Sequence, residues 1–160
     1  MKRQGGFTLI ELVVVIVILG ILAVTAAPRF LNLQNDARSA SLQGLKGAMA
    51  GASGIVYGKA AVNGEESQPT VTAASSATGV NLVFGYPEAS VNGIGAAVDG
   101  LAAGGDFTAI ADHDKISGAT NIIVYGFAGD TAKDSTCVVT YTTQASAGAP
   151  AITSPDADAC

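Results

Sequence analysis

Hydrophobic side chains fill an unbroken stretch near the start of the chain, from Phe7 to Ala27, in which Glu11 is the one charged residue. A helix of these 21 residues spans about 32 Å, roughly the hydrocarbon core of a bilayer. Lys2 and Arg3 precede the stretch, so we expect a cytoplasmic N-terminus and a chain that lies outside after Pro28. A carboxylate inside a membrane helix is costly, and Glu11 therefore suggests a specific partner.

Beyond the apolar stretch, hydrophobic residues recur at spacings of mostly three and four, which predicts a helix with an apolar stripe. Stop signals near residue 60 (Gly58, Asn63 and Gly64) end the predicted helix, which would run from Phe7 to about Ala60. The stripe comprises Phe30, Leu33, Ala37, Leu42, Leu45, Met49, Ala52 and Val56. The polar side comprises mainly Asn32, Asp36, Ser39, Gln43 and Lys46.

Two residues interrupt this long helix. Pro28 has no N–H to donate to the carbonyl of Val24, and its ring clashes there, so we expect a kink. Gly20 weakens the helix by about 1 kcal/mol relative to Ala. The helix is therefore weakened at each end of the segment between them. A common Gly and a harmless Pro kink are the alternative interpretation.

The remaining residues, 61–160, predict a β-rich head. Residues 61–79 are small and polar and predict a loop. Short runs of β-branched and aromatic residues follow, and they predict strands at 80–84, 107–111, 121–127 and 137–143. Residues 92–105 are rich in Gly and Ala and fit either a short helix or a loop. A long helix followed by three or four strands predicts an α+β fold, with an antiparallel sheet packed over the helix stripe.

Charge is distributed unevenly along the chain. Between Arg29 and Lys59 there are four basic residues and one acid, whereas from Ala61 onward two lysines face eleven acids. An acidic head repels nucleic acid, so we expect no nucleic-acid partner. The acids predict an ordinary solvated surface, or, as an alternative, contact between the basic helix of one copy and the acidic head of another.

The two cysteines, Cys137 and Cys160, lie beyond the membrane segment. An even count in that compartment favours one disulfide, and two free thiols are the alternative. No catalytic, phosphate-binding or zinc pattern stands out, so the sequence predicts neither an enzyme nor a cofactor. Asp106, Asp112, His113 and Asp114 form a weak divalent-ion pattern without a calcium-loop spacing, which favours a solvated turn over a metal site.

The stretch Gly5-Gly6-Phe7-Thr8-Leu9-Ile10-Glu11 resembles the processing signal of type IV prepilins. The resemblance implies cleavage between Gly6 and Phe7 by a membrane aspartyl peptidase, which also methylates the new amine of Phe7. It also implies that Glu11 meets the Phe7 amine of another subunit, and that the segment between Gly20 and Pro28 unwinds in the filament. A cleaved secretory signal peptide is the alternative, and the length of the apolar stretch, Glu11 and Pro28 all argue against it.

The resemblance divides the chain into a leader (1–6), a membrane and assembly helix (7–28), an amphipathic continuation (29–60) and a head (61–160). It implies an inner-membrane precursor with a cytoplasmic leader and a periplasmic head, and then an extracellular pilus. The implied partners are other pilin subunits, the prepilin peptidase and methyltransferase, the inner-membrane assembly machinery and an unknown surface receptor.

The stretch PRFLNLQNDARSASLQGLKGAMAGASGIVYGKA, together with Phe84-Gly85-Tyr86-Pro87, resembles mannose-sensitive haemagglutinin (MSHA)-type major pilins. This resemblance implies adhesion to surfaces and host cells, with mannose-sensitive agglutination. Two alternatives stay open: a type II secretion pseudopilin, which shares the processing signal, and a membrane-anchored surface domain that never polymerises. A C-terminal cysteine pair favours the pilin over the pseudopilin.

Overall fold

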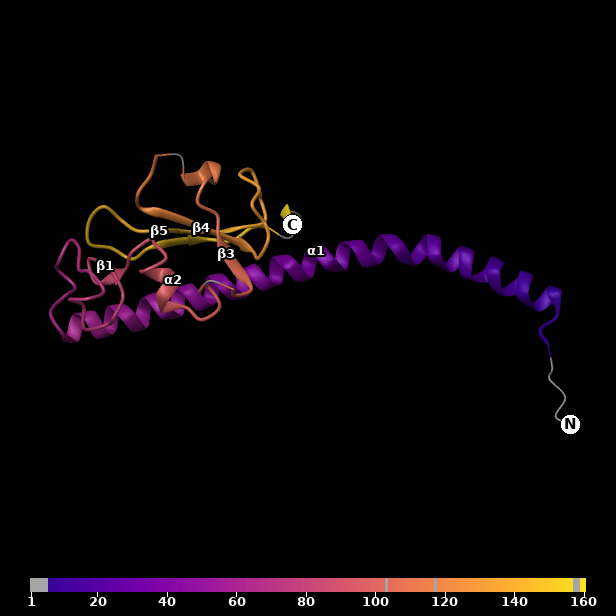
Figure 1. Cartoon of the computed structure of the whole chain (residues 1–160), viewed down its shortest axis with the longest axis horizontal. Coiled ribbons are helices and arrows are strands. Elements are labelled where there is room, and N and C mark those ends of the chain that lie inside the picture. The colour runs from indigo at the N-terminus through magenta and orange to yellow at the C-terminus, as the bar shows by residue number, and fades with distance from the viewer. Residues whose placement is uncertain (1–5, 103, 117, 157–158) are drawn as a thin grey trace, which may run out of the picture.

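A single helix dominates the fold. The computed structural model describes residues 6–102, 104–116, 118–156 and 159–160. Residues 1–5 and the side chains of Ala27, Pro28, Phe30, Leu31 and Asn32 lie outside this description. Helix α1 (Leu9–Val62) has 54 residues and runs through Gly20 and Pro28 without a break, bending along its length (Figure 1). The prediction of one continuous helix is confirmed, and it ends within two residues of the expected stop.

The head folds along the second half of α1 (Figure 1). Strands β1 (Leu82–Val83) and β2 (Tyr86–Pro87) form a small hairpin, and α2 (Ile94–Ala97) is one helical turn. An antiparallel sheet of four strands has the order β3-β4-β5-β6. Its strands are Phe107–Ala109, Ile122–Phe127, Val139–Thr142 and Ala151–Thr153, and the 3-10 turn η1 (Asp114–Ile116) lies between β3 and β4. The predicted α+β class with an antiparallel sheet is confirmed.

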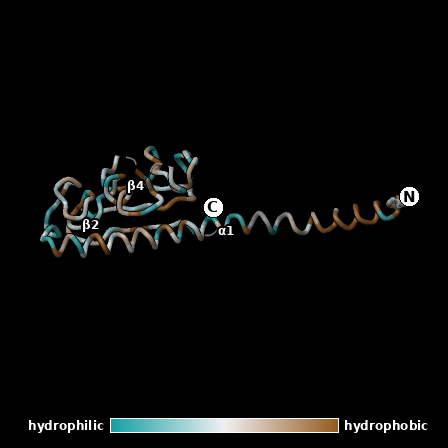
Figure 2. The backbone as a smooth tube through the Cα atoms, turned by 60° about the horizontal axis from the view of Figure 1, so that its bottom comes forward, coloured by the Kyte–Doolittle hydropathy of each residue, from teal (hydrophilic) through white to brown (hydrophobic). Residues whose placement is uncertain are grey.

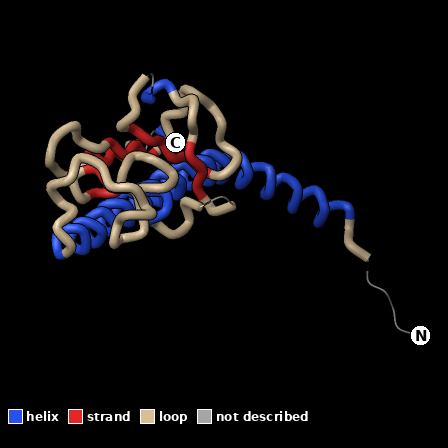
Figure 3. Tube along the Cα trace, turned by 60° about the vertical axis from the view of Figure 1, so that its left-hand side comes forward, coloured by secondary structure: helices blue, strands red, loops and turns tan. Residues whose placement is uncertain are grey.

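The main core fills the space between α1 and the sheet, which lie against each other in Figure 3. Leu42, Leu45 and Met49 from α1 pack with Tyr125 and Tyr141 from the two central strands. Both tyrosines are fully buried. The small cluster on the opposite face of the sheet contains Ile110, Val124 and Val138. Strand β4 is therefore buried on both faces, which explains its nearly continuous apolar sequence.

The buried stripe on α1 is shorter than predicted and includes a polar residue. Leu42, Leu45 and Met49 are buried as expected, but Leu33 is 60% exposed because the head does not reach that far along the helix. Ser39 was placed on the polar side and is instead buried, at 1% exposure. A short hydroxyl-bearing side chain fits where the head approaches the helix closely. The prediction was wrong because it used only the polarity of the residue.

In the head, one predicted strand needs correction, one open choice is decided and one strand was not predicted. The strand expected at 80–84 contains only Leu82–Val83, and it pairs with β2 outside the main sheet. The reason is a tight turn at Phe84 and Gly85, which both have positive φ. Residues 92–105, left open between helix and loop, contain the single turn α2. Strand β6 was not predicted, because its three residues lie between Pro150 and Pro155 and are too few to show alternation.

Candidate functional site

The first 18 residues of α1 are not buried by the rest of the subunit. Leu9–Ala26 is long and apolar enough to cross a membrane, and none of it is buried within the subunit. Figure 2 shows the same segment as the most hydrophobic part of the trace. So much exposed apolar surface is unstable in water, so the segment requires a lipid or protein environment.

Glu11 occupies the first turn of α1, where Thr8 caps the helix. The Thr8 backbone N–H and the Thr8 hydroxyl each donate to Glu11 Oε2 at 2.8 Å. The Glu11 N–H donates back to Thr8 Oγ1 at 3.3 Å. This reciprocal arrangement is a capping box, and an acidic side chain also suits the positive end of the helix dipole.

The capping box was not predicted, although its signal is visible as Thr8-Leu9-Ile10-Glu11. Glu11 thus has a local partner in the uncleaved chain. Phe7, directly before the cap, is 91% exposed, and Gly6 has open space where a Cβ would lie. The Gly6–Phe7 bond is therefore accessible.

The opposite side of α1 from the head carries a regular row of glycines. Their spacing is three, four, three and four residues, so at 100° per residue they fall within an arc of about 80°. The arc lies opposite Leu42, Leu45 and Met49, and a Cβ added at any of these glycines meets nothing within 4 Å. The residues of this glycine face are Gly44, Gly47, Gly51, Gly54 and Gly58.

Gly20 and Pro28 both lie within the continuous helix of the isolated subunit. Gly20 also has open space around it. Pro28 cannot donate to the carbonyl of Val24, so one intrahelical bond is missing there. The unwinding between these two residues that the resemblance implies for a filament stays a prediction.

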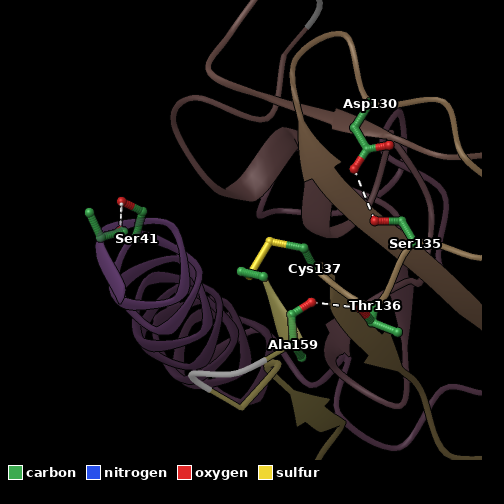
Figure 4. The surroundings of a disulfide bond; sticks show 8 residues. Ser41, Asp130, Ser135, Thr136, Cys137 and Ala159 are labelled. Carbon is green, nitrogen blue, oxygen red and sulfur yellow. Dashed lines mark hydrogen bonds between the residues drawn. A yellow bond between two sulfur atoms is a disulfide. The ribbon is translucent and has the colours of Figure 1, made fainter. Parts of the chain in front are cut away.

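Cys137 and Cys160 form a disulfide, with a Cα–Cα separation of 4.7 Å. The bond joins Cys160 to Cys137, which lies two residues before β5 (Figure 4). The Thr136 hydroxyl donates to the Ala159 carbonyl at 2.6 Å, so a hydrogen bond holds the same closure. The predicted pairing is confirmed.

The tail before Cys160 is docked on the sheet. Strand β6 pairs with β5 along Ala151–Thr153, and Ile152 lies opposite Tyr141. Ile152 also packs against the main core. The disulfide therefore reinforces a strand that already belongs to the sheet.

His113 does not lie in a solvated turn, contrary to the prediction. Its side chain is buried, at 3% exposure. Its Nε2 is 2.9 Å from the Ser135 carbonyl oxygen, and its Nδ1 accepts a bond from the Lys115 N–H at 3.1 Å. The ring thus joins the turn at η1 to the loop before β5. Among the described residues, no three His, Cys, Asp or Glu side chains come together as a metal site requires.

These features agree with comparisons to known proteins. Residues 1–27 match the prokaryotic N-terminal methylation motif. The chain is also similar to PilA5 of Thermus thermophilus, described as the major component of the type IV narrow pilus. They are 47% identical over 53 residues, which is 33% of this chain and 46% of the relative. The match thus spans less than half of that relative. No solved structure matches the chain. Together these findings support a type IV pilin-like chain.

Proposed function

We propose that this chain is the structural subunit of a type IV pilus. The observation that carries the proposal is the Gly6-Phe7 junction, which stands two residues before an unburied apolar helix with Glu11 in its first turn. The methylation motif over residues 1–27 and the similarity to a pilus component support it. In this role the chain has a structural function rather than an enzymatic one.

In the proposed life cycle, the precursor sits in the inner membrane through residues 7–28, with the leader in the cytoplasm and the head in the periplasm. A prepilin peptidase cuts after Gly6 and methylates Phe7. The assembly machinery then extracts the subunit, and other subunits replace lipid around Leu9–Ala26. This exchange explains how the fully exposed segment can remain covered before and after assembly.

Cleavage changes the role of Glu11. In the precursor its carboxylate accepts two bonds from Thr8. Cleavage creates a positive amine on Phe7, and an incoming subunit can present this amine to the Glu11 of a neighbour. Desolvation offsets much of the attraction, so the pair sets the axial register of the subunits more than it stabilises the filament.

The glycine face and the segment from Gly20 to Pro28 serve the same assembly in this proposal. Small residues let helix backbones approach closely, which favours helix packing away from water. Unwinding between Gly20 and Pro28 would lengthen the subunit and allow the filament to stretch. Adhesion to surfaces and host cells, with mannose-sensitive agglutination, is the finer part of the proposal and rests on the resemblance to MSHA-type pilins.

Electron microscopy of cells with and without this gene tests the proposal. Long surface fibres that disappear on deletion and return on complementation are the expected result. Intact fibres with loss of secreted enzymes would instead indicate a type II secretion pseudopilin. Intact fibres and normal secretion, with the chain retained in the membrane, would indicate an anchored surface domain.

A further inference from the structure

A groove of about 590 Å³ opens on the head between the β1–β2 turn and the ends of β4 and β5. Figure 1 shows the β1–β2 hairpin and the loop after β5 at the end of the head farthest from the N-terminus. The residues that matter for its chemistry are Thr70, Phe84, Glu88, Asn121, Thr143 and Gln144. The groove lies apart from the assembly helix, and nothing in the proposed assembly mechanism uses it.

Phe84 has an unusual backbone conformation for its residue type. It is the one non-glycine residue with positive φ in the part of the chain that the structure describes, at 47°. With Gly85, at φ 78°, it forms a two-residue hairpin turn of the kind that favours Asn-Gly. An aromatic residue is disfavoured there, and such strain is typical of functional positions. The strained turn brings Phe84 to the wall of the groove.

The polar groups of the groove are held in place by the fold. Glu88 Oε2 accepts from Asn81 Nδ2 at 2.9 Å and from the Ser90 hydroxyl at 2.8 Å. Asn121 Nδ2 donates to the Thr143 carbonyl at 2.9 Å, so its amide oxygen remains as an acceptor. Fixed polar groups beside an apolar wall are typical of sites that orient a small ligand.

These features restrict the ligand chemistry. The lining contains one charged group, the Glu88 carboxylate, which repels phosphates and other anions. Hydroxyl-rich ligands suit the carboxylate and amide acceptors. An aromatic side chain offers an apolar surface against which the C–H face of a sugar ring can pack. We propose that this groove binds a neutral pyranoside, with Phe84 as the apolar wall and Glu88 and Asn121 as hydroxyl acceptors.

The inference rests on the proposed adhesive role, which it extends to a named site, but binding is a property of the single subunit. We therefore test the full chain before assembly, in dodecylphosphocholine micelles, because a sugar-based detergent would compete. The probes are the methyl glycosides of mannose, galactose and N-acetylglucosamine, titrated by saturation-transfer NMR. Failure of filament formation leaves this readout unchanged, so the two proposals fail separately.

Phe84→Asn separates binding from folding. Asn is favoured in this turn, so the thermal midpoint should stay equal or rise, while binding weakens at least tenfold. Gln144→Ala, at an exposed position, should weaken binding without changing the midpoint. Val91→Asn, an exposed site outside the groove, is the control and should leave binding unchanged.

Saturable binding of one glycoside that follows this pattern supports the proposal. No saturable binding of any of the three, or equal binding by wild type and Phe84→Asn, overturns it. If the groove binds no glycoside and its residues become protected from hydrogen exchange in filaments, the groove is a contact between subunits. That result also overturns the proposal.

Discussion

Glu11 Oε2 accepts two hydrogen bonds from Thr8, from the backbone N–H and from the hydroxyl, each at 2.8 Å. The residue that looks like an anomalous charge in an apolar helix is therefore also the acidic half of a capping box. These two roles of Glu11, helix capping and pairing with a Phe7 amine, make different demands on its side chain. Substitutions can separate them.

Glu11→Gln should keep the cap and abolish the charge, because Gln also serves in a capping box. We expect normal membrane insertion and few or no filaments. Thr8→Ala should weaken the cap, by about 1 kcal/mol, but keep the carboxylate and the filaments. Filament yield by shearing and electron microscopy is the measurement. Abundant filaments from Glu11→Gln would show that capping, not charge pairing, is the role of Glu11.

The processed N-terminus should be Phe7, with an added methyl group. The exposed Gly6–Phe7 junction and the methylation motif are the reasons for this expectation. Intact mass and the N-terminal peptide of protein purified from filaments provide the measurement. Gly6→Ala should slow cleavage and a larger residue should block it, whereas a chain that begins at Met1 or Pro28 would contradict the prepilin interpretation.

The long helix could be predicted from its apolar stretch and the spacing of three and four that follows it. The two central strands could be predicted because they are runs of β-branched and aromatic residues between turn residues. Strand β6 could not, because a three-residue strand depends on the neighbour with which it pairs. Buried polar residues were also misplaced. Ser39 and His113 are polar by type, yet tertiary contacts bury both of them. Such contacts leave no local pattern in the sequence.

The candidate site was predicted in part. Gly6, Phe7 and Glu11 were identified by the resemblance of their stretch to the prepilin processing signal, and the cysteine pair by its count. The capping box had a visible signal in Thr8 and Glu11 that was not used. The groove beside Phe84 had no such signal, because residues distant in sequence meet only after the head has folded.

Cys160→Ser should destabilise the head without removing β6 from the sheet. The chain-entropy model gives about 3.5 kcal/mol for a closed loop of this size, given a sequence separation of 23. Because Ile152 packs on the main core, the strand should retain slow hydrogen exchange while the last residues fray. Urea unfolding and hydrogen exchange give the two readouts. Loss of protection throughout β6 would show that the disulfide, and not strand pairing, holds the tail.

The head should lose stability between pH 10 and 12. Burial raises the pKa of Tyr125 to about 12 and that of Tyr141 to about 12, the latter against an opposing hydrogen bond from Ser53. Unfolded tyrosines ionise near pH 10, so in this window the unfolded state has lost protons that the folded state retains. Stability is constant with pH below the window on this account. Between pH 10 and 12, the free energy of unfolding falls by about 1.4 kcal/mol per pH unit for each of the two tyrosines.

Tyr125→Phe provides the control for this alkaline transition. Among the described residues, the Tyr125 hydroxyl has no hydrogen-bond partner, so its removal should leave stability at pH 8 equal or higher. The slope of the free energy of unfolding against pH, between pH 10 and 12, should fall to about half of its wild-type value. Urea midpoints at fixed pH, read together with tyrosinate absorbance, measure both effects. Identical slopes for wild type and variant would remove Tyr125 from the explanation.

The glycine face gives a test of assembly that is independent of the N-terminus. Gly51 has open space around its Cβ position, so Gly51→Ala and Gly51→Leu should both fold. Both should stabilise the helix, by roughly 0.8 kcal/mol, because Gly is a poor helix former. Only Leu adds bulk that keeps another helix at a distance, so Gly51→Leu should reduce filament number while Gly51→Ala preserves it. The thermal midpoint of the subunit and filament counts together distinguish these effects. Equal filament counts would mean that this face remains open in the fibre, and the close packing would then have to involve another face of α1.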